Sequence, residues 1–170
     1  MWILPFIGIA LGVILSDQVS KLLILANLYE GQVELIPGIL RFTYVENRGM
    51  AFGLLSDHRW VFMVFSTIGI ALVGLYLYFF AKSRLGRVAL SLIVGGGIGN
   101  MIDRVRLGFV VDFIDFCAFP KLWVWVFNIA DAAVCVGAAL FVLDLILDTV
   151  KELKKKKAPK KETEDGTDDA

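Results

Sequence analysis

The chain has 170 residues, of which 58% are hydrophobic and 20% are charged, and its formal net charge is zero. An ordinary soluble domain needs a more polar surface, and the apolar residues here come in long uninterrupted runs, so the composition indicates a membrane protein. The sequence contains one histidine and two cysteines, Cys117 and Cys135, without a CxxC pair. We therefore expect no zinc or other metal site.

Four apolar segments are long enough to cross most of a hydrocarbon core of about 30 Å, at a rise of about 1.5 Å per helical residue. The first lacks a basic segment before it and a small-residue cleavage site before Asp17, so we expect a retained span. The four segments run from about Trp2 to Ala26, from Trp60 to Ala81, from after Arg87 to Ile102, and from Trp123 to Leu147.

Two connections between the spans have a composition of their own. Val33 to Val45 is rich in β-branched and aromatic residues around the turn Pro37-Gly38, which predicts a small hairpin or sheet. The aromatic residues between Phe109 and Phe127 predict an interfacial segment, and a plain aromatic belt is an equally good account of them. The predicted fold is an all-α membrane protein with four transmembrane helices, an outer-face β-hairpin or sheet, and an interfacial segment.

Basic residues predict the orientation. A short basic connector, residues 82–87, and the lysine-rich C-terminal segment are separated by two spans and share one side, which the positive-inside rule makes the cytoplasm. We expect both termini in the cytoplasm. Residues 1–150 form one predicted domain, and residues 151–170 form a predicted charged, disordered tail that flanks the membrane and does not bind nucleic acid.

The unusual polar residues converge near one leaflet, at the predicted outer ends of the spans. Ionisable groups inside a membrane are costly, so each raises a functional hypothesis. Asn128 and Asp131 share a helix face through their i, i+3 spacing, and the glycines of residues 95–99 permit close helix contact. A purely structural role remains open for some of these groups, notably Asp17, Asn100 and Asn128.

Two carboxylates that face one water molecule offer a definite reaction. The like charges raise one pKa, so one acid stays protonated while the other is ionised, and together they hydrolyse an amide without metal or cofactor. At this point the residues leave the pairing open among Asp103, Asp112, Asp115 and Asp131.

Five short motifs follow one another along the chain: Asp17 to Lys21 (DQVSK), Asn47 to Phe52 (NRGMAF), residues 96–104 (GGIGNMIDR), residues 110–113 (VVDF) and residues 127–131 (FNIAD). In these motifs and in their order, the chain resembles the lipoprotein signal peptidases, also called signal peptidase II. Any one motif is weak, but together they are specific.

The resemblance implies an aspartic endopeptidase whose catalytic pair is Asp112 and Asp131, with Asp115 left as a structural residue. It implies that the enzyme removes the signal peptide from diacylglyceryl-modified prolipoproteins, just before the lipidated cysteine, in the bacterial inner membrane near its periplasmic face. We expect a monomer whose partners are this substrate and the bilayer. The resemblance assigns substrate binding or support to Asp17, Lys21, Asn47, Gly49, Asn100, Asp103, Arg104, Asn128 and Ala130.

Three other functions compete with this interpretation. A small ion-coupled transporter also uses intramembrane Asp and Asn, but it places them near the midplane and is built from repeats that this sequence lacks. A membrane scaffold leaves the cost of the acid cluster unexplained. Metal-dependent hydrolysis by the carboxylates predicts sensitivity to a chelator.

Overall fold

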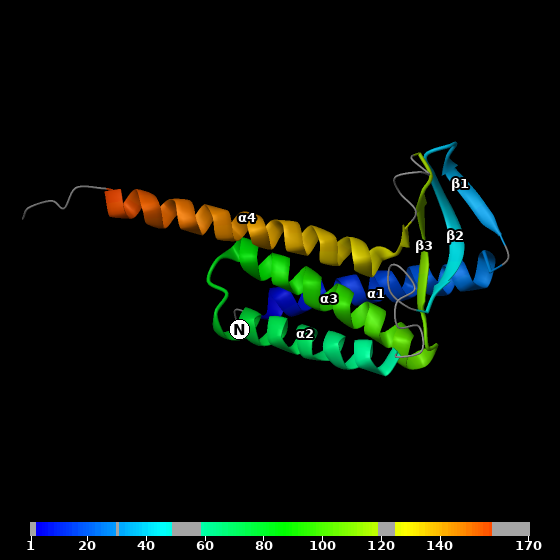
Figure 1. Cartoon of the computed structure of the whole chain (residues 1–170), viewed down its shortest axis with the longest axis horizontal. Coiled ribbons are helices and arrows are strands. Elements are labelled where there is room, and N and C mark those ends of the chain that lie inside the picture. The colour runs from blue at the N-terminus through cyan, green and yellow to red at the C-terminus, as the bar shows by residue number, and fades with distance from the viewer. Residues whose placement is uncertain (1–2, 30, 49–58, 119–124, 158–170) are drawn as a thin grey trace, which may run out of the picture.

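The structure is a computed structural model that describes residues 3–29, 31–48, 59–118 and 125–157. Helices lie side by side along the long axis, and a sheet stands across one end of them (Figure 1). The elements in chain order are α1 (Leu4–Asn27), β1 (Gln32–Ile36), β2 (Leu40–Asn47), α2 (Arg59–Phe79), α3 (Arg84–Arg106), β3 (Val110–Phe116), β4 (Val126–Phe127) and α4 (Ile129–Lys157).

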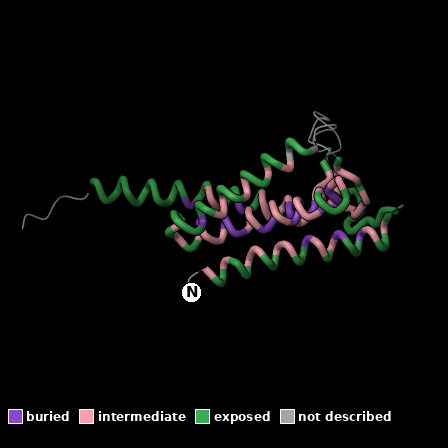
Figure 2. Tube along the Cα trace, turned by 90° about the horizontal axis from the view of Figure 1, so that it is seen from below, coloured by how far each residue is buried: buried purple, intermediate pink, exposed green. Residues whose placement is uncertain are grey.

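Three of these helices, α1, α3 and α4, are long and apolar enough to cross a membrane, and α2 contains a shorter apolar stretch, Met63–Phe79. In the most apolar window of α3, 44% of the residues are buried, against 17% in α1 and in α4. Helix α3 packs against all three other helices. It is therefore the central helix, and buried residues gather along the middle of the bundle (Figure 2).

Consecutive glycines of α3 each face a different neighbour. A Cβ on Gly95 would lie 2.8 Å from the carbonyl oxygen of Ala10 in α1, and one on Gly97 would lie 2.7 Å from Cγ1 of Ile70 in α2. A Cβ on Gly96 would meet the carbonyl oxygen of Ala130 in α4. Small residues let helix backbones approach closely, so this glycine run sets the distance from α3 to each of its neighbours.

Helix α3 begins at Arg84, a turn earlier than predicted, because Ser83 caps it. The Ser83 hydroxyl oxygen accepts a hydrogen bond of 2.8 Å from the backbone N–H of Gly86, which satisfies an otherwise unpaired amide of the first turn. The same hydroxyl donates to Oδ1 of the buried Asp144 at 2.6 Å and so ties the start of α3 to α4.

Helix α4 begins later and ends later than predicted. It starts at Ile129 because Val126 and Phe127 pair with β3, so the predicted start at Trp123 is wrong. It continues to Lys157, into the segment predicted to be disordered, where leucine, glutamate and lysine residues have good helix propensity. Residues 119–124 and 158–170 of the predicted interfacial segment and tail lie outside the described residues.

The sheet is antiparallel with the order β1-β2-β3-β4. The predicted hairpin of β1 and β2 is confirmed, with Gly38 at φ 69° in its turn. The sheet is larger than the predicted hairpin, because residues 110–116, which the sequence did not predict as a strand, form β3 and pair with β2. Val111 and Phe113 are buried against Ile24 of α1, so burial of these side chains at the end of the bundle favours the strand.

We predict that Gly96→Ala lowers the free energy of unfolding by about 1–3 kcal/mol, because the new methyl group meets backbone of α4 and forces the helices apart. Gly12→Ala is the matched control, since a Cβ there has no neighbour within 4 Å in the part of the chain that the structure describes. Thermal unfolding in detergent measures both variants. Equal midpoints for the two variants would contradict close packing at Gly96.

Candidate active site

Lys21 lies at the centre of a buried group of polar side chains at the sheet end of the bundle. Its Nζ atom is 2.8 Å from Oδ2 of Asp17 and 2.8 Å from Oδ2 of Asp103, and it donates to Oδ1 of Asn100 at 3.0 Å. The side chains of Lys21, Asp17 and Asp103 are 2%, 0% and 3% exposed. A buried ammonium needs such partners to offset its lost hydration, so Lys21 joins α1 to α3 at this depth.

The two carboxylates beside Lys21 also bind backbone amides of other elements. Oδ1 of Asp17 accepts a hydrogen bond of 2.9 Å from the N–H of Ala130, at the start of α4. Oδ2 of Asp103 accepts one of 3.1 Å from the N–H of Val111, in β3. Each acceptor is charged, which strengthens the bond. The Lys21 group therefore positions the residues that precede Asp131 and Asp112 in the chain.

Asn128 and Asp131 form a reciprocal cap at the start of α4. Oδ1 of Asn128 accepts a hydrogen bond of 2.9 Å from the N–H of Asp131, and Oδ2 of Asp131 accepts one of 3.3 Å from the N–H of Asn128. This is the geometry of a capping box, in which two amides of the first turn are satisfied at once. The i, i+3 spacing read from the sequence thus fixes the orientation of the Asp131 carboxylate.

Asn128 also connects the carboxylates of Asp112 and Asp131. Its Nδ2 donates to Oδ1 of Asp112 at 2.7 Å, while its backbone and side-chain oxygen hold Asp131. The amide of Asn47 in β2 donates to Oδ2 of Asp112 at 2.8 Å. The amide of Asn100 donates to Oδ1 of Asp131 at 2.7 Å. Each acid therefore has its own amide donor, and the two share Asn128.

Burial, together with the neighbouring charge of Asp131, raises the pKa of Asp112 to about 7. The hydrogen bonds from Asn47 and Asn128 and the charge on Lys21 act in the opposite direction and lower this pKa. Asp112 is 2% exposed, so loss of hydration is the largest cause. Arg104 is partly buried and interacts electrostatically with Asp112, Asp131 and Asp103. The site therefore holds a carboxyl group that keeps its proton close to neutral pH beside a second carboxyl group.

The structure brings the predicted site residues together from α1, β2, α3, β3 and α4, except for Gly49, which lies outside the described residues. Asp115 lies apart from them, in an ion pair of 2.6 Å with Arg41 across the sheet. Within the described ranges, no three His, Cys, Asp or Glu side chains are grouped as a ligand set for a metal.

Gln18 is a site residue that the sequence prediction missed. Its Nε2 donates to the carbonyl oxygen of Gly99 at 3.1 Å and to Oδ1 of Asp103 at 3.0 Å. Its position inside the DQVSK motif, beside Asp17, was the available signal. Gly99 belongs to the same contact, because a Cβ there would lie 2.8 Å from Oδ2 of Asp17.

Comparison with known proteins agrees with this architecture. A family model described as signal peptidase (SPase) II matches residues 9–147. The lipoprotein signal peptidase of Halothermothrix orenii is 41% identical over 138 residues, which cover 81% of this chain and 92% of that protein. The lipoprotein signal peptidase of Geobacter sulfurreducens is 38% identical over 161 residues, covering 91% and 96%.

The fold is also similar to solved structures. One bacterial membrane enzyme, whose structure was determined by the in meso method at 2.3 Å resolution, superposes with a TM-score of 0.80 at 34% identity and covers 95% of this chain and 96% of its own. A second, determined by the same method at 1.9 Å, has a TM-score of 0.78 at 35% identity, with coverage of 85% and 94%.

The helices, the sheet and the paired acids define a multi-pass bacterial membrane protein of the aspartic peptidase class. More narrowly, the chain belongs to the signal peptidase II family, the lipoprotein signal peptidases.

We predict that Lys21→Met lowers the free energy of unfolding by about 3–5 kcal/mol, because it leaves the buried carboxylates of Asp17 and Asp103 without their cation. The matched control is Lys151→Met, which removes an exposed ion pair with Asp148 and costs about 0–1 kcal/mol. Chemical unfolding in detergent compares the two. A Lys21 variant as stable as the Lys151 variant would contradict the central role of this ion group.

Proposed function

We propose that this chain removes signal peptides from prolipoproteins and that Asp112 and Asp131 are its catalytic pair. The observation that supports this pairing is the shared contact with Asn128, which holds both carboxylates at the junction of β3 and α4. Asp103 was the other candidate for the pair. Its oxygens already bind Lys21, Gln18 and the Val111 amide, so it is better suited to support.

The pair hydrolyses the scissile amide by acid–base catalysis. Asp112, whose pKa of about 7 keeps it protonated, donates to the carbonyl oxygen of the scissile bond. Asp131 takes a proton from water, whose oxygen attacks the carbonyl carbon. When the tetrahedral intermediate collapses, the C–N bond breaks, the nitrogen receives the proton held by Asp131, and Asp112 recovers its own. The reaction yields a carboxylic acid and an amine and needs no covalent enzyme intermediate.

The substrate that we propose carries a diacylglyceryl group on the cysteine that follows the scissile bond. A site at the end of the apolar helices suits it, because the signal helix and the lipid stay in the bilayer while the scissile bond reaches polar side chains. Helix α2 has 21 residues, or about 31 Å of rise, so it is long enough to cross the membrane as well. Together with α1, α3 and α4 it makes four transmembrane spans. With both termini in the cytoplasm, the site lies near the periplasmic face. The chain acts as a monomer, and residues 1–150 form the peptidase domain.

We predict that Asp112→Asn and Asp131→Asn each lower the rate of cleavage of a diacylglyceryl-modified prolipoprotein by at least about 100-fold, because each removes one proton-transfer group. Asp115→Asn is the matched control, since Asp115 lies on the same strand but pairs with Arg41. The assay uses purified protein in detergent, with and without a chelator. Residual activity in either variant would exclude that acid, and loss of wild-type activity in chelator would favour a metal-dependent reaction.

We predict that Asn47→Leu moves the basic limb of the pH–rate profile to higher pH. The Asn47 amide stabilises the ionised form of Asp112, so its removal raises the pKa of Asp112 further, and the protonated, active form persists to higher pH. The control is Asn27→Leu, because the Asn27 amide donates to the carbonyl oxygen of Leu23 within α1. A basic limb that does not move, or that moves down, would argue against Asp112 as the protonated acid.

A further inference from the structure

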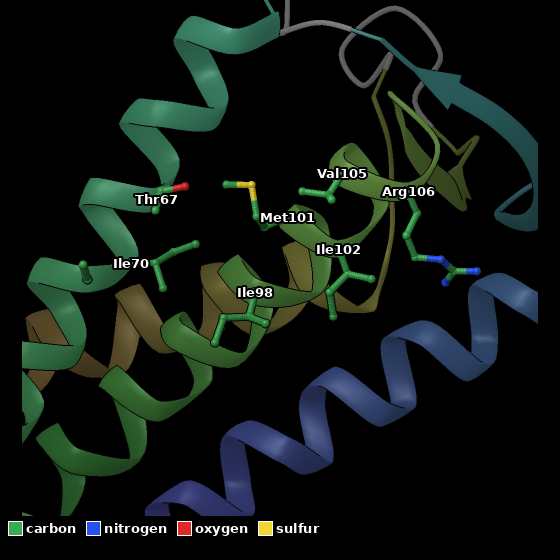
Figure 3. Close-up of a pocket in the computed structure, with 8 residues that line it drawn as sticks. Thr67, Ile70, Ile98, Met101, Ile102, Val105 and Arg106 are labelled. Atoms are coloured by element: carbon green, nitrogen blue, oxygen red, sulfur yellow. The ribbon is translucent and has the colours of Figure 1, made fainter.

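A groove with an apolar lining lies between α2 and α3, outside the cluster of acids. Its volume is about 530 Å³, within the range of about 300–1,000 Å³ typical of ligand sites. Figure 3 shows Thr67 and Ile70 of α2 facing Ile98, Met101 and Val105 of α3 across the space between the helices. At its narrow end, Ile70 packs against Gly97.

A second cavity adjoins the groove. Its volume is about 260 Å³, and it shares Val105 and Arg106 with the groove and is also lined by Trp60 and Arg104. Arg104 interacts electrostatically with both Asp112 and Asp131. The apolar groove therefore adjoins a more polar cavity, and one residue that lines this cavity interacts electrostatically with both acids.

We propose that this groove seats an acyl chain of the substrate's diacylglyceryl group, with Thr67, Ala71, Met101 and Val105 determining which chains fit. The inference rests on the proposed function, because it takes the lipid of that substrate as the occupant. A chain that enters from the bilayer side extends along the groove, while its glycerol end lies toward the second cavity and the acids. Burial of each methylene group stabilises the complex by about 0.8 kcal/mol.

The charges along the groove favour a neutral lipid. Arg106 lines it, but its guanidinium group points toward α1 (Figure 3), where Nη1 is 3.4 Å from Oε1 of Gln18. Among the groove-lining residues, therefore, no positive charge is directed into the space. A diacylglyceryl group has no charge to neutralise, whereas an anionic phospholipid would bring a phosphate that these residues leave unpaired.

The length of the groove suits part of an extended acyl chain. The groove extends along α3 from Ile98 to Val105, which is about 10 Å of helix rise.

The test compares groove-filling variants on two synthetic prolipoproteins that differ only in their acyl chains, dihexadecanoyl and dibutanoyl. Ala71→Phe and Thr67→Phe each place a ring in the groove from positions that are exposed on α2. We expect KM for the long-chain substrate to rise about tenfold, as two displaced methylene groups require, with kcat and the short-chain KM unchanged. The matched control is Leu72→Phe, at a 61% exposed position of α2 outside the groove.

If wild type cleaves both substrates and both groove variants behave like Leu72→Phe, the groove assignment is wrong and the proposed function stands. If wild type cleaves neither, the proposed function fails, and the groove assignment falls with it.

A second measurement leaves the groove residues unchanged. The Asp112→Asn variant is crosslinked to a substrate that carries a diazirine at the acyl terminus. Labelling within 67–71 or 98–105 supports the assignment. Labelling elsewhere, or labelling there by a diazirine phospholipid that substrate does not displace, overturns it.

Discussion

The contact of Lys21 with Asp17, Asp103 and Asn100 is the interaction on which the site depends. It places one positive charge between two carboxylates at 0–3% side-chain exposure, where an isolated charge would be very costly. Because the same two carboxylates also accept hydrogen bonds from backbone amides of α4 and β3, the ion group fixes backbone as well as side chains. The positions of Asp112 and Asp131 therefore depend on an ion group that lies beside them.

The burial of the site follows from the glycines of α3. Three consecutive positions face α1, α4 and α2 in turn, so every neighbouring helix approaches the central one at the same level. Close approach excludes lipid and water from the space around Lys21 and Asn100, and exclusion of water strengthens each charged hydrogen bond there. Nearer the sheet, α2 and α3 no longer pack closely, and the groove lined by Thr67 and Met101 lies between them.

The sequence predicted most of this arrangement, for reasons that differ between elements. Apolar runs predicted the helices, and the turn around Gly38 predicted the hairpin, because both signals are local. Strand β3 was missed because its stability comes from pairing with β2, more than sixty residues earlier, and from packing of Val111 and Phe113 on α1. The i, i+3 spacing predicted that Asn128 and Asp131 lie close together, but not that they form a cap. The bonds of Gln18 depend on the relative height of α1 and α3, which no local pattern specifies.

The two acids are held in unequal environments by elements of different kinds. Asp112 sits on a strand, is almost fully buried and has a pKa near 7, whereas Asp131 caps a helix and is partly exposed. Charge at a helix N-terminus is stabilised by the helix dipole and by the amides of the first turn. A strand residue gains no such stabilisation, and burial there favours the neutral form. The fold therefore places the two carboxyl groups in unequal environments, one on a buried strand and one at the start of a helix.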